Sequence, residues 1–243
     1  MSRNGVGSTP LEPAMPLEPE AIEREPRGAR RKRETRARLL DAALRLMAQK
    51  GMEGVAINEI TEAADVGFGS FYNHFESKEA IYGALVDSVF EEFGSRLDRL
   101  VRDLVDPAEV ISVCVRHTLM RAQTEPVWGH FLLREGLSMR EIGRGLGQRL
   151  LRDIRAGIEA RRFRTADPLL SFIAVSGTAL FAVATELELG QTPALRDATL
   201  PGQALTPDSL PERTSAQVLQ ILGIEQAEAS GIAHRALPRN AEL

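Results

Sequence analysis

Side chains that can hydrogen-bond to the edges of nucleic-acid bases are concentrated in one short stretch of the chain. An asparagine amide can pair with adenine, and a phenylalanine ring can contact a thymine methyl group. Small, hydroxyl-bearing and imidazole side chains beside them add contacts to sugar and phosphate oxygens. These residue types favour recognition of double-stranded DNA rather than catalysis. The residues concerned are Phe68, Gly69, Ser70, Tyr72, Asn73 and His74.

A helix-turn-helix over residues 57–75 would position these side chains. Residues 58–64 predict a short helix that packs through Ile60 and its small neighbours, and residues 68–75 predict a second one. Asp65-Val66-Gly67 predicts the turn, because aspartate tolerates positive φ better than most residues with a side chain. Phe71 and Phe75 are the apolar anchors of the second helix, whose outer face enters the major groove.

The run Phe71-Tyr72-Asn73-His74-Phe75, followed by Ser77-Lys78-Glu79, resembles the N-terminal domain of the TetR family of regulators. The similarity extends over residues 33–92. The resemblance implies an all-α fold, with an N-terminal three-helix DNA-binding domain and a C-terminal helical domain for ligand binding and dimerisation. It also implies a homodimer on a roughly palindromic operator. Most members repress, and a small-molecule effector typically reduces their affinity for DNA.

The resemblance assigns roles one residue at a time. Lys78 matches a phosphate-contacting lysine, Tyr72 matches a tyrosine that reaches the DNA backbone, and Asn73 faces the bases with Phe68 and Gly69. His74 lies against the backbone or packs inside the domain. The full set of expected DNA contacts is Asn58, Gly67, Phe68, Gly69, Ser70, Tyr72, Asn73, His74 and Lys78.

Two residues of the turn depart from the family pattern. Most members have glycine where Asp65 stands, and serine or threonine where Gly67 stands. Glycine is a weaker N-cap than serine, and it lacks the hydroxyl that often contacts a phosphate. The motif is retained, and the operator sequence is left open.

A basic run lies just before these elements. Residues 27–50 hold nine basic side chains against two acidic ones, although the whole chain has a formal net charge of −4. We expect residues 27–38 to precede the first helix and to add phosphate or minor-groove contacts that are independent of sequence and sensitive to salt.

The remainder of the chain predicts helices at 3.6-residue spacing and no strand, about nine helices in all. A narrow apolar stripe predicts one long helix over 78–104, with Ser77 as its N-cap. The other predicted helices are one that ends at Lys50 and five over 107–123, 126–135, 146–161, 167–189 and 209–222. The expected units are a disordered extension at 1–29, the DNA-binding domain at 30–80, the ligand-binding and dimerisation domain at 81–225, and a flexible tail at 226–243.

The C-terminal domain offers fewer signals. Candidate ligand-binding residues are Cys114, His117, Trp128, Phe131 and Phe172, although for each residue taken singly an ordinary place in the apolar core is the favoured interpretation. The apolar helices favour a hydrophobic effector, and the arginines across 140–164 leave an anionic one open. The resemblance implies dimerisation through the helices at 167–189 and 209–222.

Other classes of function are disfavoured. No Gly-x-Ser-x-Gly elbow, HExxH, CxxC or phosphate loop occurs, so we expect no enzyme, metal or cofactor. One cysteine forms no internal disulfide, and the sequence has no secretory signal or membrane span, so we expect a cytoplasmic protein. A repressor is favoured. An activator or a ligand-independent regulator of the same fold remains the alternative.

Overall fold

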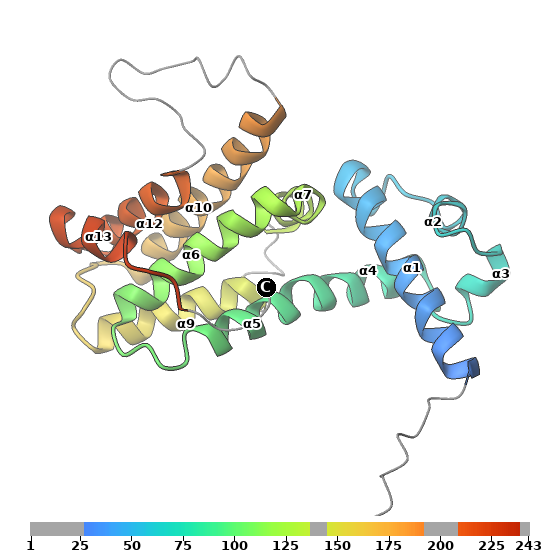
Figure 1. Ribbon diagram of the computed structural model, residues 1–243, viewed down its shortest axis with the longest axis horizontal. Helices are drawn as coiled ribbons and strands as arrows, with labels where there is room; N and C mark the ends of the chain where they lie inside the picture. The colour runs from blue at the N-terminus through green and yellow to red at the C-terminus, as the bar shows by residue number, and fades with distance from the viewer. Residues whose placement is uncertain (1–26, 137–144, 192–208, 239–243) are drawn as a thin grey trace, which may run out of the picture.

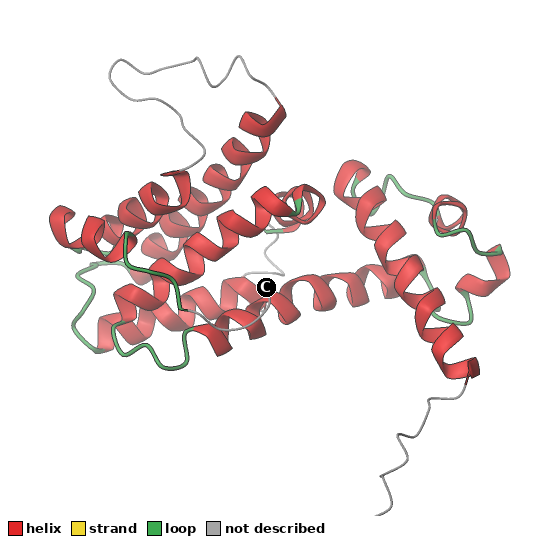
Figure 2. Cartoon of the chain, in the orientation of Figure 1, coloured by secondary structure: helices red, strands yellow, loops and turns green. Residues whose placement is uncertain are grey.

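The computed structural model describes residues 27–136, 145–191 and 209–238. These residues are helical apart from turns and short connections, with no strand among them, which confirms the all-α prediction (Figure 2). Residues 1–26 of the expected extension at 1–29 lie outside the described residues. Its last three residues are not an extension, because helix α1 already begins at Arg27.

The N-terminal domain consists of α1 (Arg27–Lys50), α2 (Ile57–Ala63) and α3 (Phe68–Phe71). Its centre is fully buried and includes Leu39, Met47, Ile60 and Phe71. Helix α1 ends where predicted, at Gly51, whose φ of 74° suits glycine. Helix α3 is shorter than the predicted 68–75, because its backbone continues through turns over residues 72–74.

The basic run does not precede the first helix but forms the first turns of α1. Residues 28–34 of this helix are all exposed, and burial begins at Thr35 and Leu39. Figure 1 shows this end of α1 projecting beyond the rest of the N-terminal domain. The basic side chains are therefore displayed on a regular helix, and not on an extended arm.

A single helical rod joins the N-terminal domain to the rest of the chain (Figure 1). It runs through α4 (Lys78–Val86), the π-helical segment η1 (Asp87–Glu91) and α5 (Glu92–Leu100), which we call the long helix. The hydroxyl of Ser77 accepts the N–H of Ala80 at 3.2 Å, as a capping residue should. At 1.5 Å per residue the long helix is about 35 Å long. It ends four residues earlier than the predicted 104.

The C-terminal domain is a helical bundle around the second half of the long helix. It contains α6 (Pro107–Thr124), α7 (Pro126–Glu135), α9 (Gly145–Glu159), α10 (Pro168–Gln191), α12 (Leu210–Ile221) and α13 (Gln226–Ala233). The prediction of a flexible tail from 226 is wrong for α13. This helix buries Ala229 and Ile232 and packs against α6 and α12. Its small residues carry no strong apolar stripe in the sequence, and the Glu225 carboxylate caps it by accepting the N–H of Ala227 at 2.8 Å.

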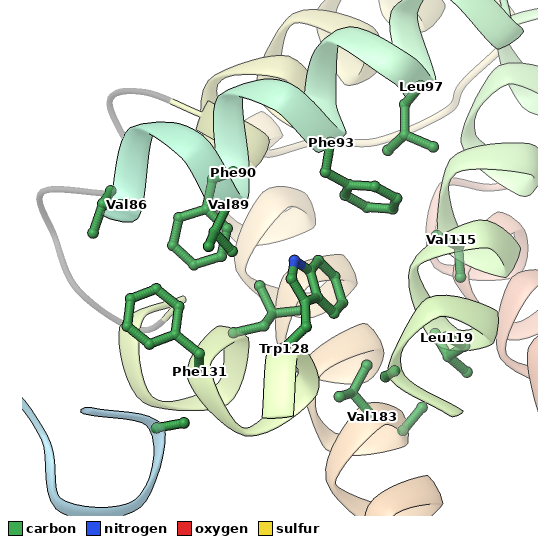
Figure 3. Close-up of a cluster of buried hydrophobic side chains, with 14 of the residues drawn as sticks. Val86, Val89, Phe90, Phe93, Leu97, Val115, Leu119, Trp128, Phe131 and Val183 are labelled. Atoms are coloured by element: carbon green, nitrogen blue, oxygen red, sulfur yellow. The ribbon is translucent and has the colours of Figure 1, made fainter. Parts of the chain in front are cut away.

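The core of the C-terminal domain is aromatic where the long helix meets α7 (Figure 3). Phe90 stacks on Phe131 with ring centroids 5.7 Å apart, and Phe93 meets Trp128 edge-on at 5.0 Å. The guanidinium of Arg121 lies within 5 Å of the Phe93 and Trp128 rings, close enough for cation–π attraction. These contacts fix α6, α7 and the long helix to one another.

Two glycines in helices give opposite predictions for stability. A β-carbon on Gly157 of α9 would lie 2.1 Å from the Phe163 ring, whereas one on Gly83 of α4 would meet nothing within 4 Å. Gly157→Ala should therefore lower the free energy of unfolding by about 1–3 kcal/mol through overpacking. Gly83→Ala should raise it by about 0.5–1 kcal/mol, because alanine is the better helix former. Urea unfolding followed by circular dichroism measures both, and a stabilising Gly157→Ala would contradict the packing described.

Candidate DNA-binding surface and ligand cavity

The turn between α2 and α3 has the backbone that the sequence predicts. Asp65 has a φ of 52°, in the left-handed region, and its carbonyl oxygen accepts a hydrogen bond from Arg38 on α1 at 3.4 Å. The N–H of Val66 donates to the carbonyl of Thr61 at 3.0 Å. Gly67 precedes α3 in an extended conformation and provides no side-chain cap. Helix α3 is therefore positioned by the turn and by its buried anchors, not by a capping hydroxyl.

The outer face of α3 exposes aromatic rings that a folded protein usually buries. Phe68 is 54% exposed and Tyr72 is 51% exposed, and their rings meet edge-on at 5.7 Å. Gly69 and Asn73 are exposed on the same short stretch, while Phe71 is fully buried beneath them. An exposed phenylalanine ring next to an exposed amide forms a surface suited to the edges of base pairs.

The other predicted DNA contacts surround this face. Ser70, His74 and Lys78 are partly exposed, Gly67 is exposed, and Asn58 is exposed in the first turn of α2. The ammonium group of Lys78 lies 3.8 Å from the carboxylate of the highly exposed Glu53, too far for a hydrogen bond. A phosphate oxygen could therefore compete for this lysine at little cost.

Basic side chains of α1 lie next to His74 and Phe75, just after α3. The sequence analysis did not predict this proximity. The guanidinium of Arg36 lies 5.0 Å from the centre of the Phe75 ring. Partial burial lowers the pKa of His74, and the charges of Lys32 and Arg36 lower it further. Neutral imidazole therefore dominates at pH 7, and the nearby positive charge comes from α1. Lys32 and Arg36 are four residues apart, so a helical interpretation of the basic run would have placed both on one face of α1.

A second candidate site is a cavity of about 350 Å³ inside the C-terminal domain. Residues of the long helix, α6, α7, α9 and α10 form its wall, which is mostly apolar. Of the five predicted ligand-binding residues, Cys114 and Phe172 line this cavity. His117, Trp128 and Phe131 do not line it. They lie in the buried core, which was the alternative interpretation of each.

Burial explains why Cys114 and His117 are poor candidates for chemistry. It raises the pKa of the Cys114 thiol far above neutrality, so the thiolate nucleophile is absent. It also lowers the pKa of His117, and the positive charge of Arg116 lowers it further. Throughout the described ranges, no three His, Cys, Asp or Glu side chains gather closely enough to hold a metal ion.

The charged residues of the cavity wall, Asp98, Arg149 and Asp153, belong to a network of ion pairs between the long helix and α9. Arg149 donates to Asp98 at 2.8 Å and to Glu91 at 2.9 Å. Arg152 donates to Asp98 at 2.7 Å and to Asp153 at 2.8 Å. The arginines that reach the cavity region are thus already paired with carboxylates. Burial raises the pKa of Asp153, whereas hydrogen bonds from Arg152 and Arg149 outweigh the burial of Asp98 and lower its pKa.

Comparison with known proteins agrees with this architecture. Residues 106–235 match the model described as "Tetracyclin repressor-like, C-terminal domain", and residues 39–85 match "Bacterial regulatory proteins, tetR family". A crystal structure of RolR in complex with resorcinol is 33% identical, with a TM-score of 0.61. The match covers 87% of this chain and 98% of that one. The chain belongs to the TetR family.

Further relatives agree on the N-terminal domain and on the fold. The transcriptional repressor DhaR of Mycobacterium sp. (strain GP1) is 41% identical over 75 residues, which is 31% of this chain and 36% of DhaR. The chain thus matches only about a third to a half of the length of its first curated relatives. FadR from Bacillus subtilis, solved with stearoyl-CoA, is 18% identical with a TM-score of 0.60, covers 78% of this chain and 99% of its own, and shows the fold alone.

Membership of the TetR family establishes the class of function. The chain is a DNA-binding transcriptional regulator and not an enzyme. The helix-turn-helix of α2 and α3 is therefore its DNA-binding element.

The left-handed backbone at Asp65 yields a prediction about the turn. Asp65→Ala should lower the free energy of unfolding by about 1 kcal/mol, because an L residue with no local hydrogen-bonding group is strained at positive φ. Asp65→Asn should leave it nearly unchanged, since asparagine tolerates this region as well. Thermal unfolding of the three proteins tests the difference. Equal losses for alanine and asparagine would show that the carboxylate charge matters and the backbone does not.

Proposed function

We propose that this protein is a cytoplasmic, homodimeric repressor that binds a roughly palindromic operator and is released from it by a small, largely hydrophobic ligand. The observation that carries the proposal is the exposed aromatic and amide face of α3 above its buried anchor Phe71. The repressors DhaR and KstR among its relatives favour repression over activation. Activation remains the second candidate.

DNA contact would combine two surfaces. The α3 face, with Phe68, Gly69 and Asn73, would read base edges in the major groove. Tyr72, Lys78 and the basic first turns of α1, including Lys32, would bind phosphates on either side. The basic side chains contribute affinity that depends on salt, and the α3 face contributes specificity.

Dimerisation is supported by the apolar outer face of α10. Leu169, Leu170, Ile173 and Phe181 are each more than half exposed, and the side of Gly177 is open. By length and composition alone, Pro168–Glu188 could cross a membrane, but core helices of soluble proteins pass the same test. Helix α10 packs against α6, α7, α9 and α12. A second copy on this face would bury it. The dimer must then hold its two recognition helices about 34–36 Å apart, because successive major grooves have that spacing.

The cavity supports a neutral ligand with an apolar body and at least one hydroxyl group. Its wall is mostly apolar, and Thr118 and Asp153 offer acceptors for a hydroxyl. The arginines that would attract an anion are paired with Asp98 and its neighbours, which disfavours the anionic alternative. Resorcinol, the ligand named for the similar RolR structure, has this chemistry.

The proposed DNA contacts predict two distinct kinds of loss. Asn73→Ala should weaken binding to the selected operator by about 10–100-fold and leave non-specific binding unchanged, because it removes a base contact. The double variant Lys32→Gln/Arg36→Gln should weaken both kinds of binding, and the slope of log affinity against log salt should become shallower by about 2. Fluorescence anisotropy at several salt concentrations measures these changes.

The operator itself would come from selection of bound sequences from a random DNA pool. Glu62→Gln, a change at an exposed residue of α2 that is not among the proposed DNA contacts, serves as the control and should bind like the unaltered protein. If Asn73→Ala binds the selected operator with unchanged affinity and selectivity, α3 does not read bases as proposed.

The proposed ligand class predicts that resorcinol weakens operator binding by about tenfold or more and that the operator weakens resorcinol binding by the same factor. Trp128, the single tryptophan, is buried against Phe93 of the long helix and provides a fluorescence signal. Asp153→Asn should reduce resorcinol affinity by about tenfold, as loss of a charged acceptor does. Asp103→Asn, at an exposed turn, is the control. Stronger release by the anion decanoate than by resorcinol would contradict this ligand class.

A further inference from the structure

The long helix is fixed at both ends to different walls of the cavity. Near its N-terminal end, the hydroxyl of Tyr82 donates to the carboxylate of Glu135 on α7. Near its C-terminal end, the carboxylate of Asp98 accepts hydrogen bonds from Arg149 and Arg152 on α9. Helices α7 and α9 both line the cavity. Any change in their separation must therefore be absorbed by the long helix between these two points.

The segment between the two points is the π-helical η1. A π-helix carries one more residue per hydrogen-bonded turn than an α-helix, is rare, and occurs mostly as a single turn at functional sites. The backbone remains helical on either side, with φ and ψ of −56° and −47° at Val86 and of −63° and −46° at Glu92. A change of register can therefore take place within η1 without breaking the long helix.

Glu91, the last residue of η1, binds the beginning of α9 with both of its carboxylate oxygens. One oxygen accepts the backbone N–H of Gly145 at 2.8 Å, and the other accepts Arg149 at 2.9 Å. Gly145 has a φ of 58°, so it reaches this oxygen through a backbone conformation that favours glycine. The carboxylate also lies at the N-terminal end of the α9 dipole, where negative charge is stabilised.

Arg149 extends this contact along the long helix. Its guanidinium lies so close to the backbone at Gly94 that a β-carbon there would be 2.7 Å from its central carbon. It spans from Glu91 to Asp98, across about two turns, and it lines the cavity. Phe90, also in η1, lines the cavity and stacks on Phe131 of α7 (Figure 3). A ligand in the cavity would thus touch both η1 and the arginine that holds it.

We propose that η1 is a hinge within the long helix and that Glu91 is the positioning residue that couples this hinge to α9 and so to the cavity. The inference rests on the proposed function, since the cavity must hold the effector for the hinge to transmit its effect. When a hydroxyl group of the ligand competes for one hydrogen bond of Arg149, the contact between Glu91 and Arg149 is weakened. The register of η1 is then free to change, and α4 moves with the DNA-binding domain relative to α9.

The neighbouring Glu92 provides a matched control. Its side chain is 59% exposed against 44% for Glu91, and it pairs with Arg96 on the same helix at 2.7 Å. Glu91→Ala and Glu92→Ala therefore remove the same charge from adjacent positions, but only the first breaks the contact with α9. Glu91→Gln keeps an acceptor for Gly145 while it removes the charge that holds Arg149, and should give an intermediate result.

The test measures coupling and geometry separately. In Glu91→Ala the release of operator DNA by resorcinol should fall from tenfold or more to below about threefold, while resorcinol still binds.

Spin labels at Glu62→Cys on α2 and Gln226→Cys on α13, in a Cys114→Ser background diluted with unlabelled protein, report the distance between the domains. Glu91→Ala should shift or broaden this distance distribution without any ligand, and Glu92→Ala should not. Thermal unfolding confirms that each variant is folded.

The outcomes separate the two proposals. If resorcinol releases neither the unaltered protein nor any variant from operator DNA, the proposed ligand class is wrong. The distances measured without ligand still test whether η1 is a hinge. If Glu91→Ala and Glu92→Ala give the same distances and the same release, Glu91 does not couple η1 to α9 and the hinge is overturned.

Discussion

The apolar stripe of the long helix is the constraint on which both domains depend. Ile81 and Leu85 complete the core of the DNA-binding domain, and Phe90, Phe93 and Leu97 continue the same stripe into the C-terminal bundle. These residues belong to one connected cluster of buried side chains, so the two cores are not independent. A displacement of the long helix within the C-terminal bundle therefore also moves the DNA-binding domain, which contains α3.

A second contact, between α7 and the end of α1, also connects the C-terminal domain to the DNA-binding domain. Arg134, at the end of α7, donates to the carbonyl oxygen of Gln49 at 3.0 Å and also reaches that of Ala48 at 3.4 Å, at the end of α1. These carbonyls are among the last of α1 and have no partner within the helix. Helix α7 thus touches the cavity through Leu132 and the end of α1 through Arg134, only two residues later. The cavity and the DNA-binding domain are separated by very little intervening structure.

Local sequence rules predicted the elements that local physics decides. The turn at Asp65, the end of α1 at Gly51 and the cap at Ser77 each follow from one residue's backbone or hydroxyl. Features fixed by distant contacts were missed. Helix α13 owes its order to packing on α6 and α12, and the shortness of α3 and the π-helical register of η1 leave no periodic signal. Likewise, core and cavity residues of the same type are indistinguishable until the helices are placed, as Phe131 and Phe172 show.

The ion pairs around α9 decide which charge a ligand in the mostly apolar cavity can carry. An arginine cluster in a sequence suggests an anion site, yet Arg149 and Arg152 each meet two carboxylates, and those carboxylates come from the long helix and from α9 itself. Separating such partly buried pairs leaves charges without partners, which is costly. A neutral hydroxyl compound can bridge or compete for one hydrogen bond without adding charge to the cavity. Recognition of the ligand and strain on the long helix would then arise from the same few hydrogen bonds, so that affinity and response are linked.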